Sequence, residues 1–271
     1  MKERFTYLFI CLFLLHIFEF NAQEKISTKA SNVSILEKEF EVTSLEVSYK
    51  IWVYLPPNYE NSSKKFPVIY MHDAQNLFDN ATSYAGEWSI DETLNDLFKK
   101  TKKGFIVVGI ENSGAKRIDE YTPFKNEKYG GGKGSLYIDF LVNELKPFID
   151  KTYRTKSDAK NTGLIGSSLG GLISFYGGLK HPNVFGKIGA LSTSFWFSDE
   201  IYEFAKENGN QKNLKIYFLV GDKEGEGMVS DTEKMEKLLL KSGFPSKNIK
   251  TKIVPEGKHN EAFWKSEFLE T

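Results

Sequence analysis

The chain has 271 residues, of which 40% are hydrophobic and 14% aromatic, enough to bury one sizeable core. Lysine plus arginine and aspartate plus glutamate both total 36, so the formal net charge is zero and no basic field attracts nucleic acid or acidic lipid. These values disfavour a nucleic-acid-binding function.

The first predicted element is a secretory signal peptide at residues 1–23. Lys2 and Arg4 precede an apolar run that ends at Phe18, and small or polar residues follow. The run is shorter than the roughly 20 residues that cross a bilayer. We therefore expect a secreted or periplasmic protein with no stable membrane insertion after cleavage; an uncleaved membrane anchor is the alternative. Cleavage also removes Cys11, the only cysteine, and with it any thiol nucleophile.

The remaining chain predicts an α/β fold. Residues 37–56 alternate apolar and polar side chains, as in a half-buried hairpin. Five short apolar runs are typical of strands buried on both faces: 66–73, 104–110, 161–166, 186–192 and 214–221. Helical patterns lie near 90–100, 136–151, 170–180, 199–207 and 230–242, and we expect Pro147 to kink or restart its helix. This alternation predicts a mostly parallel sheet with helices on both faces, in one domain at 24–271.

A serine motif lies between a predicted strand and a predicted helix. Residues 166–170 read Gly-Ser-Ser-Leu-Gly, which matches the G-x-S-x-G pattern of a nucleophile elbow with Ser168 at its centre. The strained turn requires nearly side-chain-free residues two before and two after the nucleophile, and Gly166 and Gly170 occupy these positions. We therefore predict that Ser168 is the nucleophile and that Ser167 packs in the turn.

Three histidines remain after signal cleavage as candidates for the general base. His181 follows a helix and is expected to be solvated, and His72 ends a strand upstream of the serine. His259 follows the last strand-like segment, 249–254, and precedes a C-terminal helix. Because the triad of α/β-hydrolases runs serine, acid, histidine along the chain, position favours His259.

Two backbone N–H groups are expected to bind the oxyanion. One belongs to Leu169, at the amino end of the helix after the serine. The other comes from the loop after residues 66–73, where Ala74 or Gln75 is the expected donor. His72 and Asp73 are interpreted as a hydrogen-bonded pair that orders this loop.

Four carboxylates near the end of the strand at 214–221 compete for the role of triad acid. Asp231 is interpreted as a helix N-cap, Asp222 as a residue that orders the turn, and Glu226 lies further out. Glu224 lies one short loop beyond the strand, with Gly225 to turn the backbone back. Glu224 is therefore predicted, with Asp222 as the alternative.

Several segments together resemble the esterase family related to esterase D, from about residue 40 to the C-terminus. They include YMHDAQNLFD, EYTPF, LIGSSLGGLISFYGGLKHPNVFG and EGKHNEAFW. Enterochelin esterases, feruloyl and acetyl-xylan esterases, S-formylglutathione hydrolases and mycolyltransferases are relatives. The resemblance implies an α/β-hydrolase fold, a Ser-acid-His mechanism and neither cofactor nor metal. It favours Gln75 as the second oxyanion donor, by likeness to the mycolyltransferases, and it matches Glu224 to the acid position of the family.

The substrate is less well defined. Arg117 and Tyr121 follow the strand at 104–110 and are predicted to bind substrate, although an Arg117–Glu120 pair that fixes the loop is an equal alternative. Trp196, next to Phe197, is predicted as an aromatic wall for a sugar or phenolic ring, with a core or lid role as the alternative.

These observations predict a secreted serine esterase that acts on acyl or hydroxycinnamoyl esters of carbohydrates. The alternatives are a siderophore esterase of the enterochelin type, an acyltransferase of the mycolyltransferase type, and a non-catalytic binding protein on a hydrolase scaffold.

Overall fold

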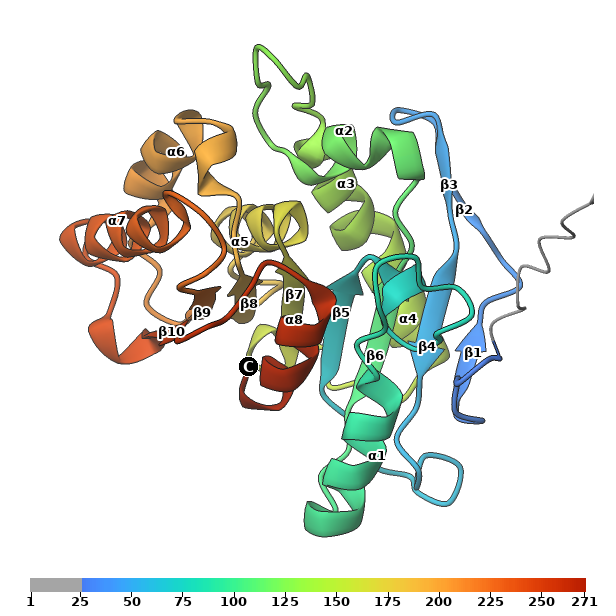
Figure 1. The fold of residues 1–271 in the computed structure, drawn as a ribbon. Coiled ribbons are helices and arrows are strands. Elements are labelled where there is room, and N and C mark those ends of the chain that lie inside the picture. The colour runs from blue at the N-terminus through green and yellow to red at the C-terminus, as the bar shows by residue number, and fades with distance from the viewer. Residues whose placement is uncertain (1–25) are drawn as a thin grey trace, which may run out of the picture.

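The computed structural model describes residues 26–271, so the predicted signal peptide lies outside the described residues. An eight-stranded sheet occupies the centre of the molecule, in the order β1-β4-β6-β5-β7-β8-β9-β10 (Figure 1). Its strands are Val33–Ile35 (β1), Ile51–Tyr54 (β4), Val68–His72 (β5), Ile106–Ile110 (β6), Thr162–Ser167 (β7), Lys187–Leu191 (β8), Lys215–Gly221 (β9) and Ile249–Val254 (β10). A separate hairpin pairs Phe40–Val42 (β2) with Val47–Tyr49 (β3).

The sheet is mostly parallel, as the sequence predicts. β5 to β10 all run parallel to one another, whereas β4 pairs antiparallel with both β1 and β6. The predicted hairpin at 37–56 forms only in part, because β4 leaves it to join the large sheet and is buried along its whole length.

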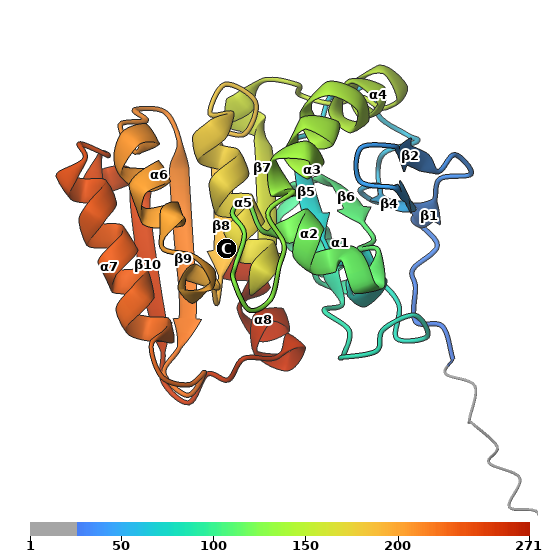
Figure 2. The same ribbon diagram turned by 90° about the horizontal axis from the view of Figure 1, so that it is seen from above.

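Helices cover both faces of the sheet. The main α-helices are Ile90–Thr101 (α1), Arg117–Tyr121 (α2), Gly134–Phe140 (α3), Lys146–Thr152 (α4), Leu169–Lys180 (α5), Glu200–Asn208 (α6), Met228–Lys241 (α7) and Glu261–Glu267 (α8). α1 and α8 contribute to the hydrophobic core on one face, and α3 to α7 to the core on the other. Figure 2 shows α7 at one end of the sheet and the β2–β3 hairpin at the other.

The helical segment around Pro147 is divided, as expected. A single π-helical stretch, Leu141–Leu145, separates α3 from α4, and Pro147 lies in the first turn of α4. The residues before α4 are also helical, and the π-helical turn accommodates the ring and the missing N–H of Pro147, which a regular i→i−4 ladder does not tolerate.

Burial on both faces explains the continuous apolar strands. Along β5, Tyr70 belongs to the core shared with α5, whereas its neighbour Met71 belongs to the core shared with α1. Alternate side chains point to opposite faces, so both must be apolar. Because β5 to β10 are parallel, their carboxyl ends meet at one edge, and the predicted site residues follow these ends.

Candidate active site

Ser168 lies at a strained turn between β7 and α5. Its backbone angles are φ 58° and ψ −122°, a positive φ that side-chain-bearing residues rarely adopt. The turn is closely packed: a Cβ on Gly166 would lie 2.5 Å from the backbone carbonyl group of Gly170. The Ser168 N–H donates to Leu191 O of β8 at 2.9 Å, so the neighbouring strand holds the turn. These contacts give the geometry that the sequence predicts for the elbow.

His259 and Glu224 form a pair at the carboxyl ends of β10 and β9. The Nδ1 atom of His259 lies 2.9 Å from Oε2 of Glu224, whose side chain is fully buried. This contact leaves Nε2 of His259 available for a second partner. The His259 ring also packs edge-on against Trp264, with ring centroids 5.1 Å apart.

The other oxygen of Glu224 has two donors. Oε1 accepts a hydrogen bond from Gly221 N and another from Ser192 Oγ, both at 2.6 Å. Ser192 Oγ accepts in turn from Nε1 of Trp264 at 2.7 Å. The carboxylate is thus fixed by a chain of contacts that sequence reasoning missed, because Ser192 and Trp264 are 72 residues apart.

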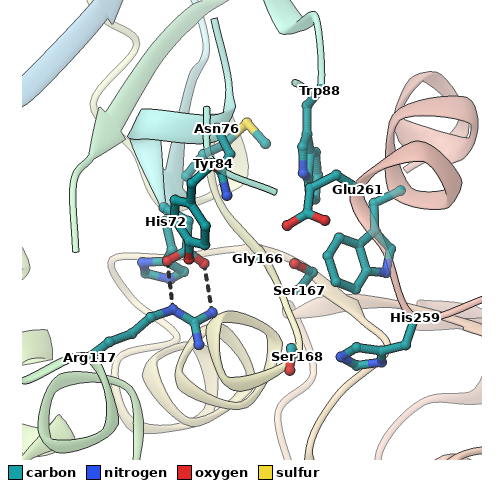
Figure 3. A pocket seen from close by; sticks show the side chains of 13 residues that line it. His72, Asn76, Tyr84, Trp88, Arg117, Gly166, Ser167, Ser168, His259 and Glu261 are labelled. Carbon is teal, nitrogen blue, oxygen red and sulfur yellow. Dashed lines mark hydrogen bonds and ion pairs between the residues drawn. The ribbon is translucent and has the colours of Figure 1, made fainter. Parts of the chain in front are cut away.

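Ser168 and His259 line the same cavity of about 230 Å³, and both face it in Figure 3. No hydrogen bond joins them; Ser168 Oγ lies 3.2 Å from Ser194 Oγ instead. Serine–histidine contacts are often long without substrate and tighten when it binds. The structure therefore brings Ser168 and His259 to one cavity, and Glu224 contacts the Nδ1 atom of the histidine.

The predicted oxyanion donors begin two helices at the same edge. Leu169 is the first residue of α5. Gln75 lies in the 3-10 turn Ala74–Asn76, whose hydrogen bonds are donated by Asn76 and Leu77, which leaves the N–H of Gln75 free of that ladder. Asp73, just before this turn, and Asn76, its last residue, line the cavity.

Arg117 forms a half-buried ion pair with Asp73. Nε and Nη2 of Arg117 donate to the two carboxylate oxygens at 2.7 and 2.8 Å (Figure 3). Asn112 Nδ2 donates to Oδ1 of the same carboxylate at 2.7 Å. Burial alone would raise the pKa of Asp73, but the Arg117 charge and these hydrogen bonds outweigh it and lower the pKa. The alternative Arg117–Glu120 pair is wrong: Glu120 accepts from Ser113 N.

His72 and Asp73 do not bond to each other; each orders the loop through a different partner. Nδ1 of His72 lies 2.8 Å from the Tyr137 hydroxyl, and burial lowers the pKa of His72 to about 3, so it is neutral. The predicted pairing of His72 with Asp73 is therefore replaced by two separate contacts, to Tyr137 and to Arg117.

Tyr121 is misplaced by the sequence prediction. Its side chain is fully buried, and its hydroxyl accepts a hydrogen bond from Asp73 N at 3.2 Å. The Arg117 guanidinium lies 5.0 Å from the centre of its ring. Tyr121 therefore supports Arg117 and Asp73 from behind and has no surface with which to contact substrate.

Trp196 and Phe197 lie in different environments, one exposed and one in the core. Phe197 is buried in the core, whereas the Trp196 side chain is 52% exposed. The Trp196 ring contacts Tyr129 edge-on, with ring centroids 5.9 Å apart, and Asn126 Nδ2 donates to Phe197 O, which ties their two loops together. Neither Trp196 nor Tyr129 lines the Ser168 cavity; they form an exposed aromatic pair outside it.

Three further cavity residues were not singled out from the sequence. Tyr84 and Trp88 lie in the long segment after β5, and Glu261 begins α8. In Figure 3 the Glu261 carboxylate points into the cavity, and burial raises its pKa. One feature of the sequence could have indicated Glu261 as a site residue: it follows His259 by two residues.

Two of the competing carboxylates, Asp222 and Asp231, have other roles in the structure. Asp222 Oδ1 accepts from Glu256 N at 2.8 Å, so it orders the turn as predicted. The N-cap interpretation of Asp231 is wrong, because α7 begins earlier, at Met228, with Gly227 at the cap. Asp231 lies in the first turn, where its charge favours the helix dipole.

A serine on a strand-to-helix turn, with a histidine and a buried carboxylate at the same edge of a mostly parallel sheet, defines the α/β-hydrolase class. A sequence model of the family described as "Putative esterase" matches residues 42–271. The chain belongs to this esterase family and is a carboxylic ester hydrolase with a small-molecule ester as substrate.

Similar proteins include the uncharacterized protein YbbA of Bacillus subtilis, 30% identical over 236 residues that cover 80% of this chain and 88% of YbbA. The endo-1,4-beta-xylanase/feruloyl esterase of Xylanibacter ruminicola is 29% identical over 219 residues, which cover 77% of this chain and 26% of that protein. Among solved structures, the enterochelin esterase of Shigella flexneri has a TM-score of 0.70 at 17% identity, covering 89% of this chain and 57% of that one. The last likeness concerns the fold. Within residues 26–271, no helix is both long and apolar enough to cross a bilayer.

Proposed function

We propose that the protein is a secreted serine esterase that acts through Ser168, Glu224 and His259. The observation that carries this proposal is the contact between the fully buried Glu224 side chain and Nδ1 of His259, together with the cavity that His259 and Ser168 both line. Glu224 holds the imidazole so that Nε2 faces the serine, and it stabilises the cation that forms when the imidazole takes a proton. Secretion follows from the predicted signal peptide at residues 1–23.

The reaction proceeds in two steps through an acyl-enzyme. His259 removes the proton of Ser168 as Oγ attacks the ester carbonyl, and the N–H groups of Leu169 and Gln75 bind the oxyanion. His259 then gives this proton to the leaving alcohol. In the second step His259 takes a proton from water, the resulting hydroxide attacks the acyl group, and the carboxylic acid leaves Ser168, which regains a proton.

We further propose that the acyl group is a single-ring hydroxycinnamoyl or short acyl group. A cavity of about 150 Å³ holds benzene, so the cavity of about 230 Å³ at Ser168 suits one substituted ring. Tyr84 and Trp88 offer aromatic walls, and Arg117 and Glu261 offer polar contacts for ring hydroxyls. The similarity to a xylanase/feruloyl esterase supports a carbohydrate as the alcohol.

The aromatic pair outside the cavity fits that alcohol. Trp196 and Tyr129 are both exposed, and sugar rings commonly stack on such aromatic surfaces in binding sites. Trp196 lies two residues beyond Ser194, whose hydroxyl touches that of Ser168. We propose that the pair binds a sugar on the leaving side of the ester.

The experiment compares purified wild type with Ser168→Ala, using Ser167→Ala as the adjacent matched control. Hydrolysis of methyl ferulate, a feruloylated arabinoxylan oligosaccharide, acetylated xylan and a catecholate trilactone is followed by chromatography. Ser168→Ala is expected to lose activity by several orders of magnitude and to escape labelling by a fluorophosphonate, whereas Ser167→Ala retains most activity.

Three outcomes would overturn parts of the proposal. Full activity in Ser168→Ala removes the serine mechanism. Preference for the trilactone over every carbohydrate ester assigns the enzyme to siderophore esters. Transfer of the acyl group to an added sugar in place of water makes it an acyltransferase.

A further inference from the structure

Three carboxylates gather beside the N-terminal end of α1, outside the Ser168 cavity. Glu87, Asp91 and Glu92 each place a carboxylate oxygen within 4.8 Å of those of the other two. None of the three lines the cavity, but Trp88, next to Glu87 in the chain, does. The group is therefore connected through the chain to the aromatic wall of the candidate active site.

Two oxygens of this group are buried and have no hydrogen-bond donor. Asp91 is fully buried; its Oδ2 accepts from Ala30 N at 2.8 Å, but its Oδ1 has no donor. Oε2 of Glu92 is likewise buried without a donor. A buried acceptor left unsatisfied costs about 1–3 kcal/mol, more when it is charged. Both oxygens therefore require a partner that the hydrogen bonds of the described chain do not supply.

Protein cations do not fill this role. Among residues 26–271, no lysine or arginine nitrogen lies within 4.0 Å of the carboxylates of Glu87, Asp91 or Glu92. The neighbouring cation, Lys265, donates to Ser89 Oγ at 2.6 Å. The positive end of α1 favours acids in its first turn by about 0.3–1 kcal/mol each, which is less than the cost of one orphaned buried oxygen.

We propose that Glu87, Asp91 and Glu92 bind a hard divalent cation, Ca²⁺. The donor set consists of oxygen atoms alone, which excludes the nitrogen and sulfur ligands that Zn²⁺ prefers. Three clustered carboxylates on a helix and its preceding loop fit the flexible coordination of Ca²⁺, with water completing the shell. The Thr28 hydroxyl, which donates to Oε1 of Glu87 at 2.9 Å, marks the open side of the site.

The site would join three parts of the molecule. Thr28 and Ala30 belong to the N-terminal segment, Asp91 and Glu92 to α1, and Glu87 adjoins Trp88 of the cavity wall. The expected effect of Ca²⁺ is thus on stability first. The inference does not depend on the proposed serine mechanism.

The test uses the full secreted chain, stripped with EDTA and titrated with Tb³⁺ at pH 7.5. Trp88 is close enough to sensitise Tb³⁺ luminescence, and added Ca²⁺ should displace the signal. Thermal unfolding should shift upward by roughly 5–10 °C at 100 times the dissociation constant of Ca²⁺.

Two variants and a control separate the cation from the fold. Glu92→Gln and Asp91→Asn should lose the Ca²⁺ shift, and Glu92→Gln should unfold at the same temperature as wild type or higher in EDTA, because it relieves the crowding. Glu233→Gln, on the exposed side of α7, should keep the full shift. The proposal is overturned if 10 mM Ca²⁺ changes neither luminescence nor unfolding of the wild type, or if Mg²⁺ is bound in preference to Ca²⁺.

Discussion

Both oxygens of the Glu224 carboxylate are engaged, one by His259 and the other by Gly221 N and Ser192 Oγ. Such a carboxylate keeps the imidazole in one orientation and one tautomer. The carboxylate of Asp222, two residues earlier, accepts a hydrogen bond from the backbone N–H of Glu256. The two acids of one short loop therefore have separable roles.

We expect Glu224→Gln to lower kcat for an aryl ester by up to about 10⁴-fold, because the amide presents the wrong partner to Nδ1. Asp222→Asn, the matched control from the same loop, should cost less than about tenfold. Steady-state kinetics with circular dichroism as a check on folding decide the matter. A crippled Asp222→Asn beside a nearly normal Glu224→Gln would transfer the acid role to Asp222.

At this scale the sequence predicts residues whose roles depend on chain order and local turns. Ser168 is defined by the glycines around it, and His259 by its place after the last strand. Arg117 illustrates the limit: its partner Asp73 is 44 residues away, while Glu120 is near in sequence but faces Ser113. Side-chain pairing across loops depends on tertiary geometry that local patterns do not contain.

At the scale of elements, the crossing of β7 and α5 at the elbow depends on an absent side chain. A Cβ on Gly166 would meet the Gly170 carbonyl group at 2.5 Å and the His72 ring at 2.8 Å. Gly163, earlier in the same strand, has no neighbour closer than 3.7 Å to such a Cβ. The strand thus contains one glycine that is sterically required and one that is not.

Gly166→Ala is expected to destabilise the protein by about 1–3 kcal/mol or more, because backbone atoms must move to admit the methyl group. Gly163→Ala should change the free energy of unfolding by less than about 1 kcal/mol. Urea denaturation of both variants measures the difference. Equal stability of the two would mean that the elbow relaxes more easily than its packing indicates.

Element types could be predicted better than element boundaries. Continuous apolar runs identified the parallel strands because burial on both faces requires them. β1, with only three residues, has too little pattern to be recognised, and α7 begins before the segment whose periodicity marks it, so Asp231 was misread as its cap. The position of a short edge strand and the first residue of a helix depend on tertiary contacts, which local sequence patterns do not contain.

At the scale of the whole molecule, two cores meet at a sheet that carries a buried, neutral histidine. His72 is 2% exposed and is the last residue of β5, where the hydroxyl of Tyr137 from α3 contacts its Nδ1. Burial lowers its pKa to about 3, against about 6.5 in an unfolded chain. Acid therefore protonates His72 in the unfolded state before it does so in the native state.

The native protein should lose stability from this source as the pH falls from 6.5 toward 3, at up to about 1.4 kcal/mol per pH unit, because only the unfolded state takes up the proton. Carboxyls with raised pKa values, such as Glu92 and Glu261, act in the opposite direction, since the native state protonates them first.

A comparison of variants isolates the contribution of the histidine. His72→Asn should be less stable than wild type at pH 7.5. The gap between the two proteins in the free energy of unfolding, measured by urea denaturation, should narrow by up to about 2.7 kcal/mol between pH 6.5 and 4.5. Tyr137→Phe removes the same hydrogen bond but keeps the imidazole, so its gap should stay open over that range. A gap for His72→Asn that does not change with pH would mean that His72 takes up its proton in the folded protein as readily as in the unfolded chain.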